Sequence, residues 1–314
     1  MNTTKYSMRN FFLLLNFLLL SVISALINMN IAFAQETKNV FPHNVFSYKI
    51  GNIEVYLLSE GQQNGNTSIL IGATPEMLQK AIPEGTFTTA TNVFLVRSEG
   101  KNILIDAGYG RNLFDNLQSL GINSEQIDVV LITHMHGDHI GGLLRDGKAT
   151  FPNATLYLSQ AENDYWTSDK EMNKTAENRR GGFQYAQEVI NAYPNRHLFI
   201  PDEIESKPNF LFPEIQGIVA YGHTPGHTMF MLGSGKQKIL IWGDLTHALP
   251  VQMLYPQLAV IYDVNTEQAI SSRKKVLEYV SKNNIPIAGM HIAFPGMGNI
   301  KANSEGGYIF TPLQ

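Results

Sequence analysis

Short apolar runs alternate with longer amphipathic stretches along most of the chain. Runs rich in Ile, Val and Leu and bounded by Gly or Asp predict strands, at residues 53–59, 92–96, 103–106, 129–133, 156–159, 218–221, 229–232, 239–242, 258–262 and 287–290. Helical spacing of apolar positions predicts helices, at residues 112–120, 161–166, 184–192 and 266–282. This strand-rich mixture predicts two sheets covered by helices in one α/β domain.

The first 34 residues have a different pattern. Lys5 and Arg9 precede a mostly apolar run over residues 11–27, and Ala32-Phe33-Ala34 follows it. This three-part layout predicts a signal peptide over residues 1–34 that is cleaved after Ala34, leaving a domain of residues 35–314 in the periplasm or outside the cell. The alternative is an uncleaved anchor, because about 17–20 apolar residues can span a bilayer. Cleavage would leave no stable membrane insertion.

Composition narrows the possible chemistry. Hydrophobic residues make up 44% of the 314 positions and charged residues 16%, which argues against a disordered or coiled-coil protein. The absence of cysteine excludes disulfides, thiolate metal sites and cysteine nucleophiles. The formal charge of −4, which becomes −6 without Lys5 and Arg9, and the lack of a basic block argue against nucleic acid as a partner.

The nine histidines are unevenly distributed, and the densest cluster is HMHGDH at residues 134–139. It follows the predicted strand 129–133, at a strand end where α/β sheets commonly bind ligands. Neutral imidazoles and ionised carboxylates are typical ligands of divalent cations. His134 and His136 are expected to share one ion, and Asp138 and His139 to face a second.

Three further polar positions follow apolar strands. His227 lies in HTPGHT at residues 223–228, Asp244 follows the run 239–242, and His291 follows the run that ends at residue 290. Each one alone is explained better by ordinary hydrogen bonding than by metal binding. Together with the cluster at 134–139, they predict a site with two metal ions.

The order HxHxDH, TPGH, Gly-Asp and a late His resembles the metallo-β-lactamase superfamily. The resemblance covers residues 45–312 and is closest to the branch that contains methyl parathion hydrolase and quorum-quenching lactonases, through segments 151–154, 242–245, 251–252 and 294–298. It implies an αββα four-layer sandwich with two metals, most simply zinc, at one edge of the paired sheets. A homodimer is expected from the same relatives.

The resemblance also implies a ligand set. His134, His136 and His227 would hold the first metal, Asp138, His139 and His291 the second, and Asp244 would bridge both. His223 is then expected to be structural. Asp106 resembles the superfamily's carboxylate that steadies a ligand histidine, although a helix or turn cap explains it equally well.

Two divalent ions lower the pKa of a bridging water toward about 7, so no serine or cysteine nucleophile is needed. Asp138 is expected to orient the resulting hydroxide. The resemblance implies small ester-like substrates, N-acyl homoserine lactones first, with organophosphate triesters or aryl esters as side activities. The alternatives are a phosphotriesterase like methyl parathion hydrolase and a β-lactamase, and the bridging Asp244 counts against the latter.

Several positions bear on the substrate. Three residues after Asp244, many lactonases of the superfamily carry tyrosine and methyl parathion hydrolase an apolar residue, whereas this chain has His247. His247 is therefore predicted to donate a proton or hydrogen bond to a leaving alkoxide, the alternative being a packing role. Trp166, Phe183 and Phe87 are expected to form an apolar pocket wall. The run 273–275, Arg-Lys-Lys, is expected on the solvated face of the last helix.

Overall fold

The computed structural model describes residues 44–314. The predicted signal peptide and its cleavage site at Ala34 lie outside the described residues. Contacts divide the chain into residues 1–40 and residues 41–314, and the second unit holds the whole described fold. Within residues 44–314, no helix combines the length and the apolar character needed to cross a membrane.

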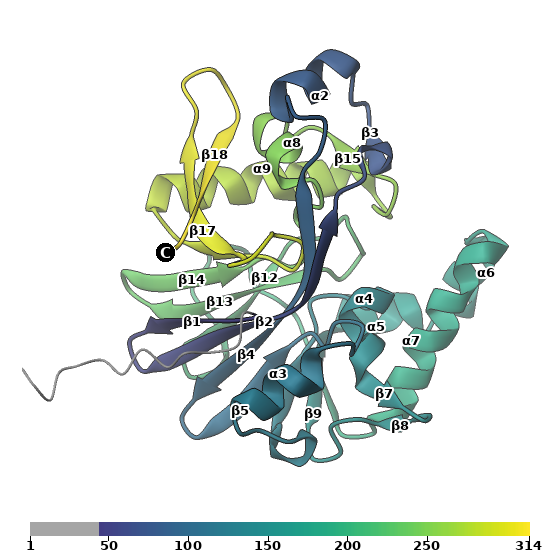
Figure 1. The fold of residues 1–314 in the computed structure, drawn as a ribbon. Helices are drawn as coiled ribbons and strands as arrows, with labels where there is room; N and C mark the ends of the chain where they lie inside the picture. Colours follow the sequence, from purple (N-terminus) through teal and green to yellow (C-terminus); the bar gives the residue numbers. More distant parts are fainter. Residues whose placement is uncertain (1–43) are drawn as a thin grey trace, which may run out of the picture. The chain divides into compact units, whose positions relative to one another are not determined.

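Residues 44–314 form two seven-stranded sheets (Figure 1). The first has the order β1(Val45–Ile50), β2(Ile53–Asn64), β4(Thr88–Ser98), β5(Lys101–Ile105), β6(Val129–Leu131), β9(Thr155–Ser159), β10(Arg196–Phe199). The second has the order β11(Phe210–Phe212), β12(Ile215–Val219), β13(Thr228–Ser234), β14(Gln237–Ile241), β16(Ile287–Ala288), β17(Met297–Ala302), β18(Tyr308–Pro312). Two short pairs complete the strands of this region, β3(Leu70–Ile71) with β15(Ala259–Val260) and β7(Leu144–Arg145) with β8(Lys148–Ala149).

Apolar side chains fill the space between the two sheets. Leu57 and Phe94 from the first sheet and Phe230 and Ile241 from the second belong to one buried cluster. Successive residues of a strand point to opposite faces. The apolar side chains on the outer face of each sheet therefore need another layer to shield them from solvent. Helices provide it on both outer sides.

The outer face of the first sheet packs against four helices, and that of the second sheet packs mainly against one long helix (Figure 1). The first set comprises α3(Leu113–Ser119), α4(Gly137–Ile140), α5(Gln160–Trp166) and α7(Arg180–Ala192). On the other side, Val276, Leu277 and Val280 of α9(Thr266–Asn283) pack against Leu240 and Ile287. The predicted αββα arrangement is confirmed.

The predicted helix 266–282 agrees with α9, which begins where the Asn265 side chain accepts a hydrogen bond from the Gln268 N–H and ends at the left-handed Asn284. The expectation for Arg273 is wrong. Its guanidinium is buried and donates to the carbonyl oxygens of Leu245 (2.7 Å) and Leu258 (2.8 Å), because the loop that follows β14 folds over it.

The sequence patterns missed many of the shorter elements. The missed strands are β1, β3, β7, β8, β10, β11 and the hairpin β17–β18. The missed helices are α2(Pro75–Ala81), α4, α6(Asp169–Lys174) and α8(Leu249–Leu254), with the 3-10 turns η1(Thr67–Ile69), η2(Ser124–Gln126), η3(Gly141–Leu143) and η4(Glu177–Arg179). Each has seven residues or fewer, which is shorter than the windows of roughly 11–18 residues over which hydrophobic periodicity is judged. Several of them nevertheless border the candidate site.

Candidate metal centre

Four loops bring the predicted ligands to one edge of the paired sheets. The first follows β6 and carries residues 134–139, and the second joins β12 to β13 and carries His223 and His227. The third follows β14 with Asp244, and the fourth follows β16 with His291. Each loop starts where a buried strand ends, so the sheets determine where its polar side chains converge.

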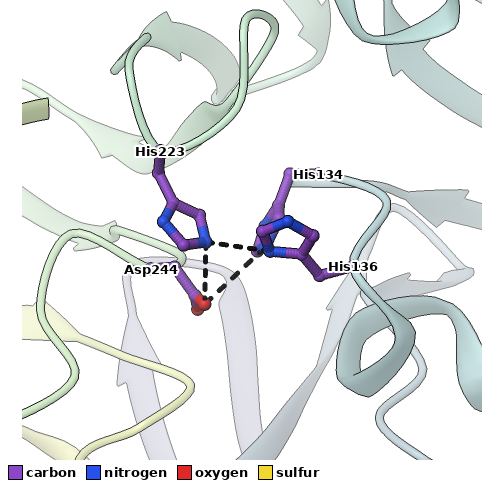
Figure 2. A group of neighbouring side chains, drawn as sticks. All are labelled: His134, His136, His223 and Asp244. Atoms are coloured by element: carbon purple, nitrogen blue, oxygen red, sulfur yellow. Dashed lines mark hydrogen bonds and ion pairs between the residues drawn. The ribbon is translucent and has the colours of Figure 1, made fainter. Parts of the chain in front are cut away.

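His134, His136, His223 and Asp244 form the first group, with all ligand atoms within 4.8 Å of one another (Figure 2). His136 Nδ1 lies 3.0 Å from His134 Nε2 and 3.0 Å from His223 Nε2. Asp244 Oδ2 lies 3.4 Å from His223 Nε2 and 3.6 Å from His134 Nε2. Three imidazoles and one carboxylate oxygen thus surround one point.

Asp138, His139 and His291 form the second group. Asp138 Oδ2 lies 3.4 Å from His291 Nε2 and 3.9 Å from His139 Nε2. Asp244 also faces this group, with Oδ1 3.0 Å from His139 Nε2 and Oδ2 3.1 Å from His291 Nε2. The Asp244 carboxylate therefore lies between the two groups.

The structure corrects the expectation for His227. Its Nε2 accepts a hydrogen bond from the Asp244 backbone N–H (2.9 Å), and its Nδ1 donates to the Ala220 carbonyl oxygen (3.1 Å). Burial, with His223 nearby, lowers the pKa of His227 to about 3, so the ring is neutral. With both nitrogens bonded to backbone, His227 supports the Asp244 loop, and His223, which was expected to be structural, lies in the ligand group instead.

The protonation states of His134, His136 and Asp244 suit cation binding. Burial lowers the pKa of His134 and of His136 well below the usual value, which leaves neutral imidazoles. Burial alone would raise the pKa of Asp244, but the surrounding imidazoles, His139 first, lower it well below its ordinary value. Burial alone would lower the pKa of His139, but the carboxylates of Asp244, Asp138 and Asp106 raise it well above its usual value. The negative potential that acts on His139 would equally attract a metal cation.

Buried atoms without a hydrogen-bond partner include two that belong to the ligand groups. Among the described residues, His139 Nε2 and Asp244 Oδ1 face each other without a hydrogen bond. Buried polar atoms are usually satisfied, and unsatisfied ones often indicate an ion. Histidine and carboxylate oxygens in this arrangement fit two divalent cations.

Acceptors behind the ligands determine which ring nitrogen faces the site. His139 Nδ1 donates to Asp106 Oδ2 (2.7 Å), His223 Nδ1 to Asp263 Oδ1 (2.9 Å) and His291 Nδ1 to the Ala90 carbonyl oxygen (2.9 Å). Each bond directs Nε2 of that ring toward Asp244, as in metal sites whose ligand histidines are held by a carboxylate or carbonyl. Asp106 thus contacts a ligand histidine, whereas the sequence also allowed it to be only a cap.

Glu162 is a residue that the sequence analysis missed. Its buried carboxylate accepts hydrogen bonds from the Met135 N–H (2.8 Å), the Trp166 indole N–H (2.6 Å), the Thr224 hydroxyl (2.7 Å) and the Gly226 N–H (3.0 Å). It therefore joins both histidine loops to the Trp166 indole. The helical spacing of Glu162 and Trp166 was visible in the sequence, but nothing local indicated the two loops.

Replacing Glu162 with Gln is expected to weaken metal binding roughly 10–100-fold, because the amide nitrogen cannot accept a hydrogen bond and would face donors. Competition with a chelator measures the affinity. Glu188→Gln, on the exposed face of α7, is the matched control. A variant with a lower melting temperature but unchanged metal affinity would show that Glu162 only stabilises the fold.

A cavity of about 810 Å³ lies over the two groups, within the roughly 300–1,000 Å³ range of small-molecule sites. His136, Asp138, Asp244, His247 and His291 form part of its lining. Trp166 and Phe183 also line it, with ring centroids 4.7 Å apart.

Phe87 does not line this cavity, contrary to expectation. Its ring packs behind Gly65, in the space where a side chain at that position would begin, and Gly65 itself lines the cavity. Phe87 belongs instead to a small apolar cluster with Ile69 and Ile82. Because Gly65 has no side chain, the Phe87 ring packs behind its backbone and does not reach the cavity.

Residues 87–285, more than half of the chain, match the sequence profile of the Metallo-beta-lactamase superfamily, and the chain belongs to this superfamily. The superfamily membership, the histidine and carboxylate groups and the related structures together identify the chain as a metal-dependent hydrolase that binds divalent metal.

Two solved structures resemble nearly the whole described chain. The hydrolase AbOPH of the beta lactamase superfamily is 29% identical with a TM-score of 0.76, covering 88% of this chain and 99% of that one. AidC, a dizinc quorum-quenching lactonase in complex with a product, is 25% identical with a TM-score of 0.77, covering 86% and 98%. Ribonuclease Z of Saccharolobus islandicus is 57% identical over 51 residues, which are 16% of this chain and 17% of that protein, so the chain matches about a sixth of that relative's length.

Proposed function

We propose that this hydrolase opens small ester-like substrates, with N-acyl homoserine lactones as the leading class, and that it is related to the methyl parathion hydrolase branch. The observation that carries the proposal is the Asp244 carboxylate between two histidine-rich groups beside a cavity with a partly aromatic wall. The likeness to AidC, a dizinc quorum-quenching lactonase, supports this substrate class. The chain's negative formal charge favours a small neutral substrate over a nucleic acid.

Seven residues would hold the cations: His134, His136, Asp138, His139, His223, Asp244 and His291. Two divalent ions, zinc in our proposal, lower the pKa of a bound water and polarise the carbonyl oxygen of the substrate when they are present.

Asp138 lies partly exposed on the cavity wall. Burial would raise its pKa, but His139 and His291 lower it, so Asp138 is ionised and Oδ2 can accept the proton of the attacking water.

His247 lines the same cavity. Its Nε2 lies 3.0 Å from Asp244 Oδ2, and its ring stacks on His291 with centroids 5.0 Å apart. Burial lowers the pKa of His247 to about 4, so the ring is neutral and carries one N–H. We propose that this N–H assists departure of the lactone's alkoxide.

His247→Leu is expected to lower lactone turnover by about 10²–10⁴-fold, the range of general acid assistance, and aryl phosphotriester turnover much less. An alkoxide is a poor leaving group, whereas a phenolate leaves without a proton. His247→Gln, which keeps an N–H, should lose less than His247→Leu. Equal losses on both substrates would contradict the role, and loss of bound metal would make His247 a ligand, since it also groups with Asp244 and His291.

One hydrolysis panel tests the proposed function. The purified protein is assayed on N-acyl homoserine lactones, aryl esters, phosphotriesters and nitrocefin. Lactones are expected to give the highest kcat/KM, a chelator to abolish turnover, and zinc or manganese to restore it. A preference for phosphotriesters or nitrocefin, or activity that resists the chelator, would overturn the proposal.

We also propose that the protein is exported after cleavage near Ala34. The charged start, the apolar run and the Ala-x-Ala site support this. N-terminal sequencing of protein from its native host should begin at Gln35 or within a residue or two of it. A membrane-bound product that retains Met1 would instead support an anchor.

A further inference from the structure

One wall of the cavity is aromatic and begins at a candidate ligand. The Trp166 ring meets the His136 ring edge to face, with centroids 5.7 Å apart, and the Phe183 ring packs against Trp166 with centroids 4.7 Å apart. The Trp166 indole N–H is bound to the buried Glu162 carboxylate. The wall is therefore held in place by packing and a hydrogen bond. Both rings are nearly fully buried, and their remaining exposed edges line the cavity next to the metal groups.

Gly182 also lines this cavity, in the first turn of α7 and next to Phe183. A Cβ atom at Gly182 would lie 3.6 Å from Trp166 Cζ3, which is ordinary van der Waals contact, and the backbone conformation is one that any residue adopts. A longer side chain there would occupy cavity space against the indole. Glycine is a poor helix former, so helix stability does not explain this residue.

Gly181 provides a matched comparison. It precedes Gly182 in the same turn and is exposed like Gly182, but it does not line the cavity. Among the described residues, no atom outside its own helix lies within 4 Å of a Cβ built on it. A substitution at Gly181 therefore repeats the change in helix propensity without filling the cavity.

We propose that Gly182 determines the length of the acyl chain that the enzyme accepts, by leaving room for the chain along the Trp166–Phe183 wall. This inference rests on the proposed function, because it assigns the apolar arm of an N-acyl lactone to that wall. The lining also includes polar residues such as Gln63 and Asn64 and apolar ones such as Ile69 and Val264. The Trp166–Phe183 wall is the apolar part that contacts the candidate ligand His136, and apolar walls of this kind favour a hydrocarbon chain.

The test compares Gly182→Leu, Gly182→Ala and Gly181→Leu on butanoyl and dodecanoyl homoserine lactone. Gly182→Leu should lower kcat/KM for the dodecanoyl substrate roughly 10–100-fold more than for the butanoyl substrate. Gly182→Ala should give a smaller change of the same sign, and Gly181→Leu should keep the wild-type ratio. The same ratio in both leucine variants would overturn the proposal. Thermal unfolding of each variant verifies that it is folded.

A binding measurement separates this proposal from the proposed function. Ring-opened dodecanoyl homoserine is titrated while tryptophan fluorescence is followed, and the signal reports Trp166 because the other tryptophan, Trp242, is fully buried away from the cavity. Wild type and Gly181→Leu should bind it, and Gly182→Leu should bind it roughly tenfold or more weakly. If wild type binds the chain but hydrolyses no lactone, the proposed function fails and the acyl site stands. If wild type does not bind it, the acyl site fails.

Discussion

Asp244→Asn is expected to remove most of the bound metal and to lower turnover by about 10²–10³-fold. The two carboxylate oxygens of Asp244 face both ligand groups, with Oδ2 3.4 Å from His223 Nε2 in the first group and Oδ1 3.0 Å from His139 Nε2 in the second. A neutral amide cannot offset the charge of two dications, and its nitrogen offers no lone pair to them. Elemental analysis of the purified protein and steady-state kinetics measure the two effects.

Asp164→Asn is a suitable control, because Asp164 is exposed and lies on the outer turn of α5. It removes the same formal charge without touching the site. About two metals per chain and near-normal activity in Asp244→Asn would exclude a bridging role for this carboxylate.

His223→Ala is expected to leave about one metal per chain and to lower turnover roughly 100-fold or more, because the first group loses one of three imidazoles. His227→Ala should behave differently. It leaves the buried Asp244 N–H without its acceptor, which costs about 1–3 kcal/mol of stability, while the ligand atoms remain. Metal content and thermal unfolding of both variants distinguish the two roles.

His223→Ala and His227→Ala are well matched, because both histidines lie in one HTPGH loop and both are fully or nearly fully buried. Asp263→Asn provides an intermediate change, because it weakens the hydrogen bond to His223 Nδ1 while the His223 ring remains. If His223→Ala kept two metals while a folded His227→Ala lost one, the sequence-based assignment of His227 would be right and the geometry misleading.

The sequence by itself determined the layers and most of the ligands. Apolar runs with strand or helix periodicity recur along the chain, and that periodicity is a local property that dictates which faces must be buried. His134, His136, Asp138 and His139 stand within six residues at the end of one such strand, so their convergence needed no knowledge of distant contacts. Asp244 and His291 also follow strands, and the sheets bring both to the same edge.

Only the tertiary structure decided the roles that depend on distant backbone. His223 and His227 are four residues apart in an irregular loop, and the choice between them depends on the Asp244 N–H, which comes from another strand end. Glu162 acquires its role from the two histidine loops, and Arg273 is buried because the loop after β14 covers it. Phe87 is excluded from the cavity by packing behind Gly65. These contacts join segments far apart in the chain, and hydrophobic periodicity carries no information about such pairings.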